Sequence, residues 1–267
     1  DVGRADYRWM NRGDRIEVPL LADGGRLAAV DWDVALDRFT AVVGGASGRV
    51  VLLASGRASL ESLAWVRRLV DAGEVTAAVR VPLGPEAPLP GLPDLALRAE
   101  RIPNLEGARL AGYTASWSAA LEAVEGAGLV LLLDVELDDA EAARLARAGS
   151  VVALASVDDE RLKGSAMLLP VTTMAEENGT YVNRDGRVQR FTQAKAPPGM
   201  ARPAWWVAAE AWSRLETGRP VPETAALAFA ALGAGIPSLS GLSYADLGGT
   251  GRAVDTGAAR PAGAGAR

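Results

Sequence analysis

The chain has 267 residues, of which 49% are hydrophobic, so it can bury a core and is long enough for one large or two small domains. It contains neither cysteine nor histidine, which excludes disulfides, Cys/His zinc sites, thiolate-held iron–sulfur clusters and Ser-His-Asp or Cys-His catalysis within this sequence. Its 28 basic and 33 acidic residues give a net charge of -5, which argues against nucleic acid as a partner. The apolar runs are shorter than the roughly 18 to 20 residues of a membrane helix. We therefore expect a soluble, intracellular protein without a direct membrane span, and the opening Asp1 suggests that the natural chain begins earlier.

The first clear periodicity begins near residue 50. Residues 50–54 (VVLLA) are apolar and β-rich, and Ser55-Gly56 is typical of a turn. Apolar residues then recur at helical spacing from 60 to 70, with Ser59 as the expected N-cap. Residues 75–81 form a second candidate strand. This segment predicts strand, turn, helix and strand in succession.

Six of the fifteen prolines fall between residues 82 and 103, which excludes a helix or a central strand there. The alternation then resumes with helices and fully apolar strands: helix 116–125, strand 129–134, helix 138–148 and strand 150–155. This pattern indicates a mostly parallel sheet covered on both faces, the doubly wound α/β class. Such sheets bind ligands at the carboxyl ends of their strands.

The C-terminal third predicts helices at 205–215 and 223–232 and a short segment at 239–247. The last residues have almost nothing to bury and predict a disordered tail. We therefore divide the chain into a connecting segment (1–40), an α/β domain (41–250) and a tail (251–267).

Three segments are candidates for ligand contacts, each with a simpler interpretation. The glycine-rich residues 44–48 precede a strand, whereas a dinucleotide fingerprint follows one, so a flexible loop is favoured. Residues 55–57 lie where backbone N–H groups can hold an anion, but they lack the spacing and Lys of a phosphate loop, which favours a plain turn. The acidic residues 134–139 could hold Mg²⁺, although Asp138 as a helix N-cap is the simpler interpretation.

A fourth segment, MAEENGTYVNRDGRVQRF at residues 174–191, predicts a β-hairpin. The strands 180–183 and 187–191 flank a loop in which Gly186 supplies the positive φ that such loops need. Its charged residues form either a solvated face or the frame of a ligand site.

This hairpin segment resembles a signature of the molybdopterin oxidoreductase superfamily. The matching spacing is Glu176-x-x-Gly179-Thr180-x-x-Asn183-x-x-Gly186-Arg187-x-Gln189. Further pieces occur in the order that the family requires: Arg15-Ile16 with Pro19-Leu20, Trp32-Asp33-x-Ala35-Leu36, Ser55 followed by Glu61, Pro103-Asn104-x-x-Gly107-Ala108, and Leu168-Leu169-Pro170. The resemblance implies a doubly wound sheet of the molybdopterin oxidoreductase type, with a hairpin and C-terminal helices.

The resemblance also implies what the chain binds. Catalytic members hold a large pterin dinucleotide, a metal with a Cys, selenocysteine, Ser or Asp ligand, and an iron–sulfur cluster. Asn183, Arg187 and Gln189 are the cofactor-binding residues if a pterin site persists. Because cysteine is absent and residues 158–167 depart from the Thr-rich stretch of the family, we expect no molybdopterin, metal ligand or catalytic residue here. Iron–sulfur clusters are expected upstream of Asp1.

Within the superfamily, the chain is most similar to the compact large iron–sulfur subunit of bacterial respiratory complex I. That similarity implies a non-catalytic scaffold for NADH-to-quinone electron transfer, with the other hydrophilic-arm subunits as partners, peripheral on the cytoplasmic face of the cell membrane. Two alternatives stay open. One is a fragment of a molybdopterin-dependent enzyme such as a formate dehydrogenase or nitrate reductase, and the other is a free-standing α/β nucleotide-binding module.

Overall fold

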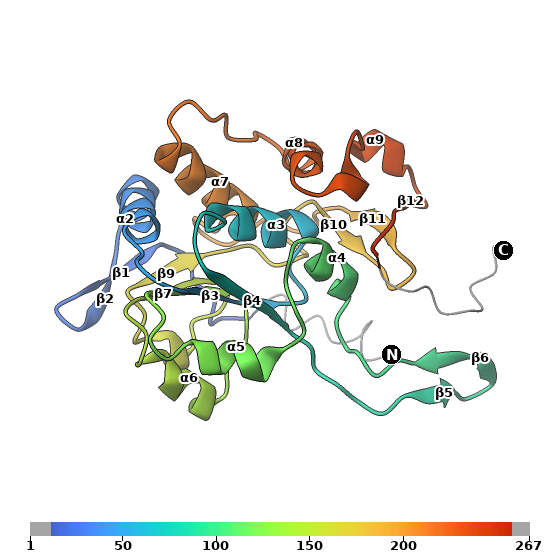
Figure 1. Ribbon diagram of the computed structural model, residues 1–267, viewed down its shortest axis with the longest axis horizontal. Coiled ribbons are helices and arrows are strands. Elements are labelled where there is room, and N and C mark those ends of the chain that lie inside the picture. The colour runs from blue at the N-terminus through green and yellow to red at the C-terminus, as the bar shows by residue number, and fades with distance from the viewer. Residues whose placement is uncertain (1–11, 258–267) are drawn as a thin grey trace.

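A computed structural model describes residues 12–257, except for the side chains of residues 93–95 (Figure 1). A seven-stranded sheet crosses the molecule in the order β2-β1-β9-β8-β7-β3-β4. Five neighbouring strands are parallel, and β1 and β2 add an antiparallel edge. The strands are β1 (Leu20–Asp23), β2 (Arg26–Ala29), β3 (Val50–Ser55), β4 (Val75–Arg80), β7 (Leu129–Leu133), β8 (Val151–Ala155) and β9 (Met167–Pro170).

The parallel strands are apolar throughout because both of their faces are covered. In β3, Val50 and Leu52 face a core shared with α2, α3 and α7, whereas Val51 and Leu53 face a second core shared with α5 and α6. Figure 1 shows these helices on opposite sides of the sheet. The helices are α2 (Trp32–Gly44), α3 (Leu60–Leu69), α4 (Leu105–Leu110), α5 (Trp117–Ala123), α6 (Asp139–Leu145) and α7 (Ala204–Leu215). The predicted α/β class with a mostly parallel sheet is confirmed.

The N-terminal residues take part in this architecture. Leu20 of β1 pairs with Leu168 of β9, and Phe39 of α2 is completely buried. The structure thus places residues 20–40 on the sheet and its covering layer, where the sequence suggested a connecting segment. The reason is a long-range strand pairing that local periodicity does not reveal.

In residues 12–257, two small sheets lie outside the main one. The proline-rich segment forms a two-stranded ribbon of β5 (Ala87–Leu89) and β6 (Leu92–Leu97), which projects from the body of the molecule in Figure 1. The predicted hairpin consists of β10 (Gly179–Val182) and β11 (Arg187–Phe191). Gly186 has the expected positive φ of 72°.

The C-terminal part contains α8 (Ala225–Ala230), α9 (Tyr244–Leu247) and the short strand β12 (Arg252–Ala253). Short 3₁₀ helices occur, among the described residues, at Glu160–Leu162, Ala231–Ala234 and Pro237–Leu239. Since β12 pairs with β11 and Val254 packs against the main core, the first residues of the predicted disordered tail are ordered. The rest of that tail, 258–267, lies outside the described residues. Within the described part of the chain, no helix has the length and hydropathy of a membrane span.

Candidate functional site

A cleft of about 810 Å³ lies at the carboxyl ends of β3, β7, β8 and β9. After β3 the chain passes through α3 to β4, whereas after β7 it passes through α6 to β8 on the other side. The neighbours β3 and β7 therefore diverge at a topological switch point, the place where open α/β sheets bind ligands. We call this the switch-point cleft.

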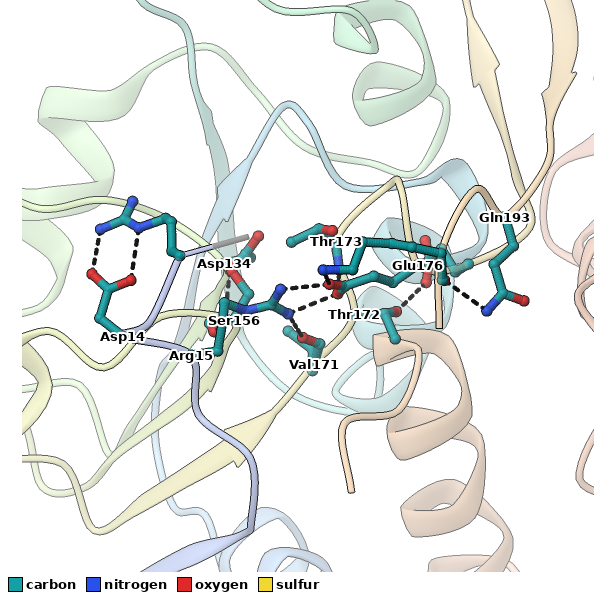
Figure 2. A network of polar contacts seen from close by, with 12 residues as sticks. Asp14, Arg15, Asp134, Ser156, Val171, Thr172, Thr173, Glu176 and Gln193 are labelled. Carbon is teal, nitrogen blue, oxygen red and sulfur yellow. Dashed lines mark hydrogen bonds and ion pairs between the residues drawn. The ribbon is translucent and has the colours of Figure 1, made fainter. Parts of the chain in front are cut away.

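Arg15 joins the loops on one wall of the cleft (Figure 2). Its guanidinium donates to the Ser156 carbonyl at 2.7 Å and to both Glu176 carboxylate oxygens at 2.5 and 2.7 Å. The side chains of Arg15 and Glu176 are almost inaccessible to solvent, with exposed fractions of 5% and 0%. Burial opposes ionisation of Glu176, but hydrogen bonds from Arg15 and Thr173 prevail and hold its pKa below the usual value.

Asp134 follows β7 directly and lines the cleft. It has a left-handed φ of 45°, the only such non-glycine residue in residues 12–257. Its carboxylate accepts a hydrogen bond from the Ser156 amide at 2.8 Å, which explains why an Asp adopts this conformation. Burial raises the pKa of Asp134, although the bond from Ser156 opposes the rise.

The other acidic residues after β7 are explained by helix capping. Asp138 accepts from the Glu141 amide at 2.8 Å, and Glu141 accepts from the Asp138 amide at 2.9 Å, which forms a capping box on α6. The favoured interpretation of Asp138 is thus confirmed. In the part of the chain that the structure describes, no group of His, Cys, Asp and Glu side chains is arranged to hold a metal ion.

Two further buried carboxyl groups, Glu177 and Glu61, accept hydrogen bonds from neutral donors. Glu177 lines it and accepts from the Thr172 hydroxyl at 2.7 Å, and burial raises its pKa to about 8. Glu61, in the first turn of α3, is completely buried. It accepts from the amide and hydroxyl of Thr180 and from the Tyr244 hydroxyl, and burial raises its pKa to about 7.

The three residues predicted as pterin contacts lie together on the hairpin but not at the cleft. Asn183 accepts from the amides of Asp185 and Arg187, both at 2.9 Å, and so shapes its own turn. Arg187 donates to the Gly251 carbonyl at 2.9 Å, and Gln189 is exposed on β11. Because two of these side chains hold the chain's own backbone, this arrangement does not fit a pterin frame at the cleft. Their role as cofactor contacts stays a prediction.

Residues 55–57, the candidate anion-binding turn of the sequence, lie at the cleft. The turn at Ser55 and Arg57 does line the cleft, where Arg57 lies 3.7 Å from Glu136 with both side chains largely exposed. Glu61 and Arg15 occurred only as motif pieces. The available signal for Glu61 was a lone acid between the apolar residues Leu60 and Leu63 on a buried helix.

The fold and the cleft define a doubly wound α/β protein with a switch-point site. Residues 90–212 match the family model of molybdopterin oxidoreductases. The predicted family resemblance is therefore confirmed over this part of the chain.

Curated relatives match shorter stretches. The chain is 32% identical over 90 residues to the alpha subunit of F420-dependent formate dehydrogenase 2 from Methanococcus maripaludis, covering 33% of this chain and 13% of the relative. It is 35% identical over 95 residues to the alpha subunit of an NADPH-Fe(3+) oxidoreductase from Geobacter sulfurreducens, covering 36% and 10%. It is 49% identical over 39 residues to the mitochondrial NADH-ubiquinone oxidoreductase 78 kDa subunit of Candida albicans, covering 15% and 5%. The chain thus spans a small fraction of each relative, and each is a subunit of an oxidoreductase.

Proposed function

We propose that this chain is the non-catalytic scaffold domain of the large iron–sulfur subunit of an NADH-quinone oxidoreductase. The observation that supports the proposal is that polar groups of the hairpin form hydrogen bonds within this same chain. Thr180 and Asn183 bond to Glu61 and to the hairpin backbone, and Arg187 bonds to Gly251. In addition, the Val182 amide donates to Asn104 at 2.9 Å. Because these hairpin groups are already bonded within the chain, a packing role for the motif is favoured over a cofactor-binding role.

The assembly follows from this role. Iron–sulfur clusters would be held by a part of the protein preceding Asp1 or by a neighbouring subunit, since this sequence has no cysteine. The partners would be the other subunits of the hydrophilic arm, and the complex would place the domain on the cytoplasmic face of the membrane. The short match to the Candida albicans 78 kDa subunit supports this choice within the family.

Isolation of the tagged natural protein from its own host tests the proposal. We expect it to co-purify with flavin- and iron-containing subunits, and we expect the preparation to reduce a quinone with NADH. A preparation that oxidises formate, or reduces nitrate, and has no NADH activity would contradict the scaffold assignment.

The switch-point cleft supports a second candidate function. A volume of about 810 Å³ at the carboxyl ends of the strands is in the range of small-molecule sites. Together with the matched formate dehydrogenase stretch, it supports a fragment of a molybdopterin-dependent enzyme. The same isolation distinguishes the two, because only this candidate predicts formate- or nitrate-dependent activity.

A further inference from the structure

Residues 82–101, here called the leucine ribbon, project from the body of the molecule. β5 and β6 form the outer part of the ribbon, and Figure 1 shows them away from the main sheet and its helices. Half of the large hydrophobic residues that are exposed in the described part of the chain lie on this one segment: Leu83, Leu89, Leu92 and Leu97. Because these leucines gather on one projection and are not scattered singly over the surface, they indicate an interaction surface.

The strand pairing of the ribbon places its leucines. Leu89 lies directly opposite Leu92 beside the turn, so the two share one face, and Leu97 lies opposite Ala87 nearer the base. The exposed fractions of Leu92 and Leu97 are 53% and 50%, and that of Leu83 is 74%. A partner that covers these side chains would remove a large apolar area from water, which favours association.

Local contacts hold the ribbon in shape. Pro90 and Gly91 connect the strands, and Gly91 has the positive φ of 76° that a tight turn accommodates. Glu86 and Arg98 form an ion pair across the strands at 2.7 Å. A ribbon that is ordered before it binds loses less conformational entropy on binding. This organisation suits a partner that folds separately, which means another chain.

The charges of the ribbon indicate the kind of partner. Arg98 and Arg101 are the only basic residues between positions 82 and 101. Both are engaged within the ribbon, Arg98 with Glu86 and Arg101 with the Pro85 carbonyl at 2.7 Å. Nucleic acids and anionic lipids attract free cations, which the ribbon does not offer. Exposed leucines without free cations fit an apolar groove of a protein.

The edge and the size of the ribbon argue against a second copy of the ribbon as its partner. Pro88 has no N–H in the middle of β5, so this strand is a poor template for a further strand. Two ribbons stacked face to face would each cover one face only. A groove around both faces would cover roughly 20 residues, which reaches the lower bound of a stable interface.

We propose that the leucine ribbon inserts into an apolar groove of another subunit and so docks this domain in its assembly. The inference rests on the proposed function, in which the chain works beside other subunits, and it adds the place of contact. Recognition comes from the leucine side chains and not from strand pairing.

One substitution in the tagged natural protein tests the proposal. Leu92→Asp places an unpaired charge in the groove, so the amount of partner subunits isolated per chain should fall roughly tenfold or more. Leu227→Asp is the matched control, because Leu227 on α8 is also 53% exposed, and it should retain the wild-type amounts. Both variants should keep the thermal unfolding midpoint of the wild type. A Leu92→Asp protein that retains every subunit, or equal losses in both variants, would overturn the proposal.

Photo-crosslinking identifies the partner directly. The amino acid p-benzoylphenylalanine in place of Leu97, irradiated in the natural assembly, should link the ribbon to a peptide of a different subunit. A link to a second copy of this chain, a link within the same chain, or no link to any protein would overturn the proposal.

Failure of the ribbon's role is distinguishable from failure of the proposed function. A wild-type preparation without NADH-dependent quinone reduction contradicts the proposed function. A wild-type preparation that has this activity, but whose Leu92→Asp variant keeps all of its subunits, contradicts the role of the ribbon alone.

Discussion

Glu176 and Glu177 are neighbours in sequence, and both are buried, yet the protein treats their charges in opposite ways. Glu176 meets the Arg15 guanidinium at 2.5 Å, and its pKa is lowered. Glu177 meets the Thr172 hydroxyl, and its pKa is raised to about 8. The comparison shows that burial alone does not decide the ionisation of a carboxyl group. Here the ionisation follows the hydrogen-bond partner, which is a guanidinium for Glu176 and a hydroxyl for Glu177.

The largest effect is expected when the cation is removed from Glu176. Arg15→Met leaves a buried carboxylate without its main partner, so we expect a loss of about 3 to 5 kcal/mol in the free energy of unfolding. Urea unfolding at pH 7 measures this change. An unfolding free energy within 1 kcal/mol of wild type would mean that Glu176 does not depend on Arg15.

Glu177 offers the converse test. Its pKa of about 8 exceeds the ordinary value of 4.5, so the wild type loses stability as the pH rises between these values. Glu177→Gln mimics the protonated acid and should match wild type near pH 5, but be more stable by about 2 to 4 kcal/mol at pH 9. Urea unfolding at both pH values gives the difference. Equal stability of the two proteins at pH 9 would show that Glu177 ionises without cost.

Substitution in the hairpin turn should have an intermediate effect. Gly186 has a φ of 72°, and an added Cβ would lie 2.9 Å from the Val254 carbonyl oxygen. Gly186→Val should therefore cost about 1 to 3 kcal/mol and impair assembly more than it impairs chemistry. Thermal unfolding and isolation of the complex check both parts. Unchanged stability together with normal assembly of the variant would show that the hairpin does not contribute to the scaffold role.

The smallest effect on the free energy of unfolding is expected for an exposed ion pair at the edge of the cleft. Arg12 and Asp14 form an ion pair 2.6 Å long, but their side chains are 43% and 44% exposed. Arg12→Ala should change the free energy of unfolding by less than about 1 kcal/mol, because solvent screens such pairs. This variant is the control for Arg15→Met, and a loss as large as that of Arg15→Met would show that burial is not the distinguishing feature.

The sequence predicted those features whose cause is local. Runs such as residues 129–133 revealed strands that are covered on both faces, Asp138 revealed a helix cap, and Gly186 revealed a turn with positive φ. Each depends on neighbours within a few residues, so periodicity and turn chemistry were sufficient.

Features that depend on distant contacts could not be predicted in this way. Leu20 pairs with Leu168, and Tyr244 bonds to Glu61 across 183 positions of sequence. The opposite environments of Glu176 and Glu177 are also set by Arg15, far away in the chain. The family motif marked Glu176 and Arg187 as important, but only the structure placed their partners within the protein.

We propose that the motif between Glu176 and Gln189 serves the protein's own packing instead of a pterin cofactor. Measurement of molybdenum and pterin in the natural protein, purified from a host supplied with molybdate, tests it most directly. We predict an amount of each far below one per chain. One molybdenum atom with a matching amount of pterin for each chain would contradict the claim.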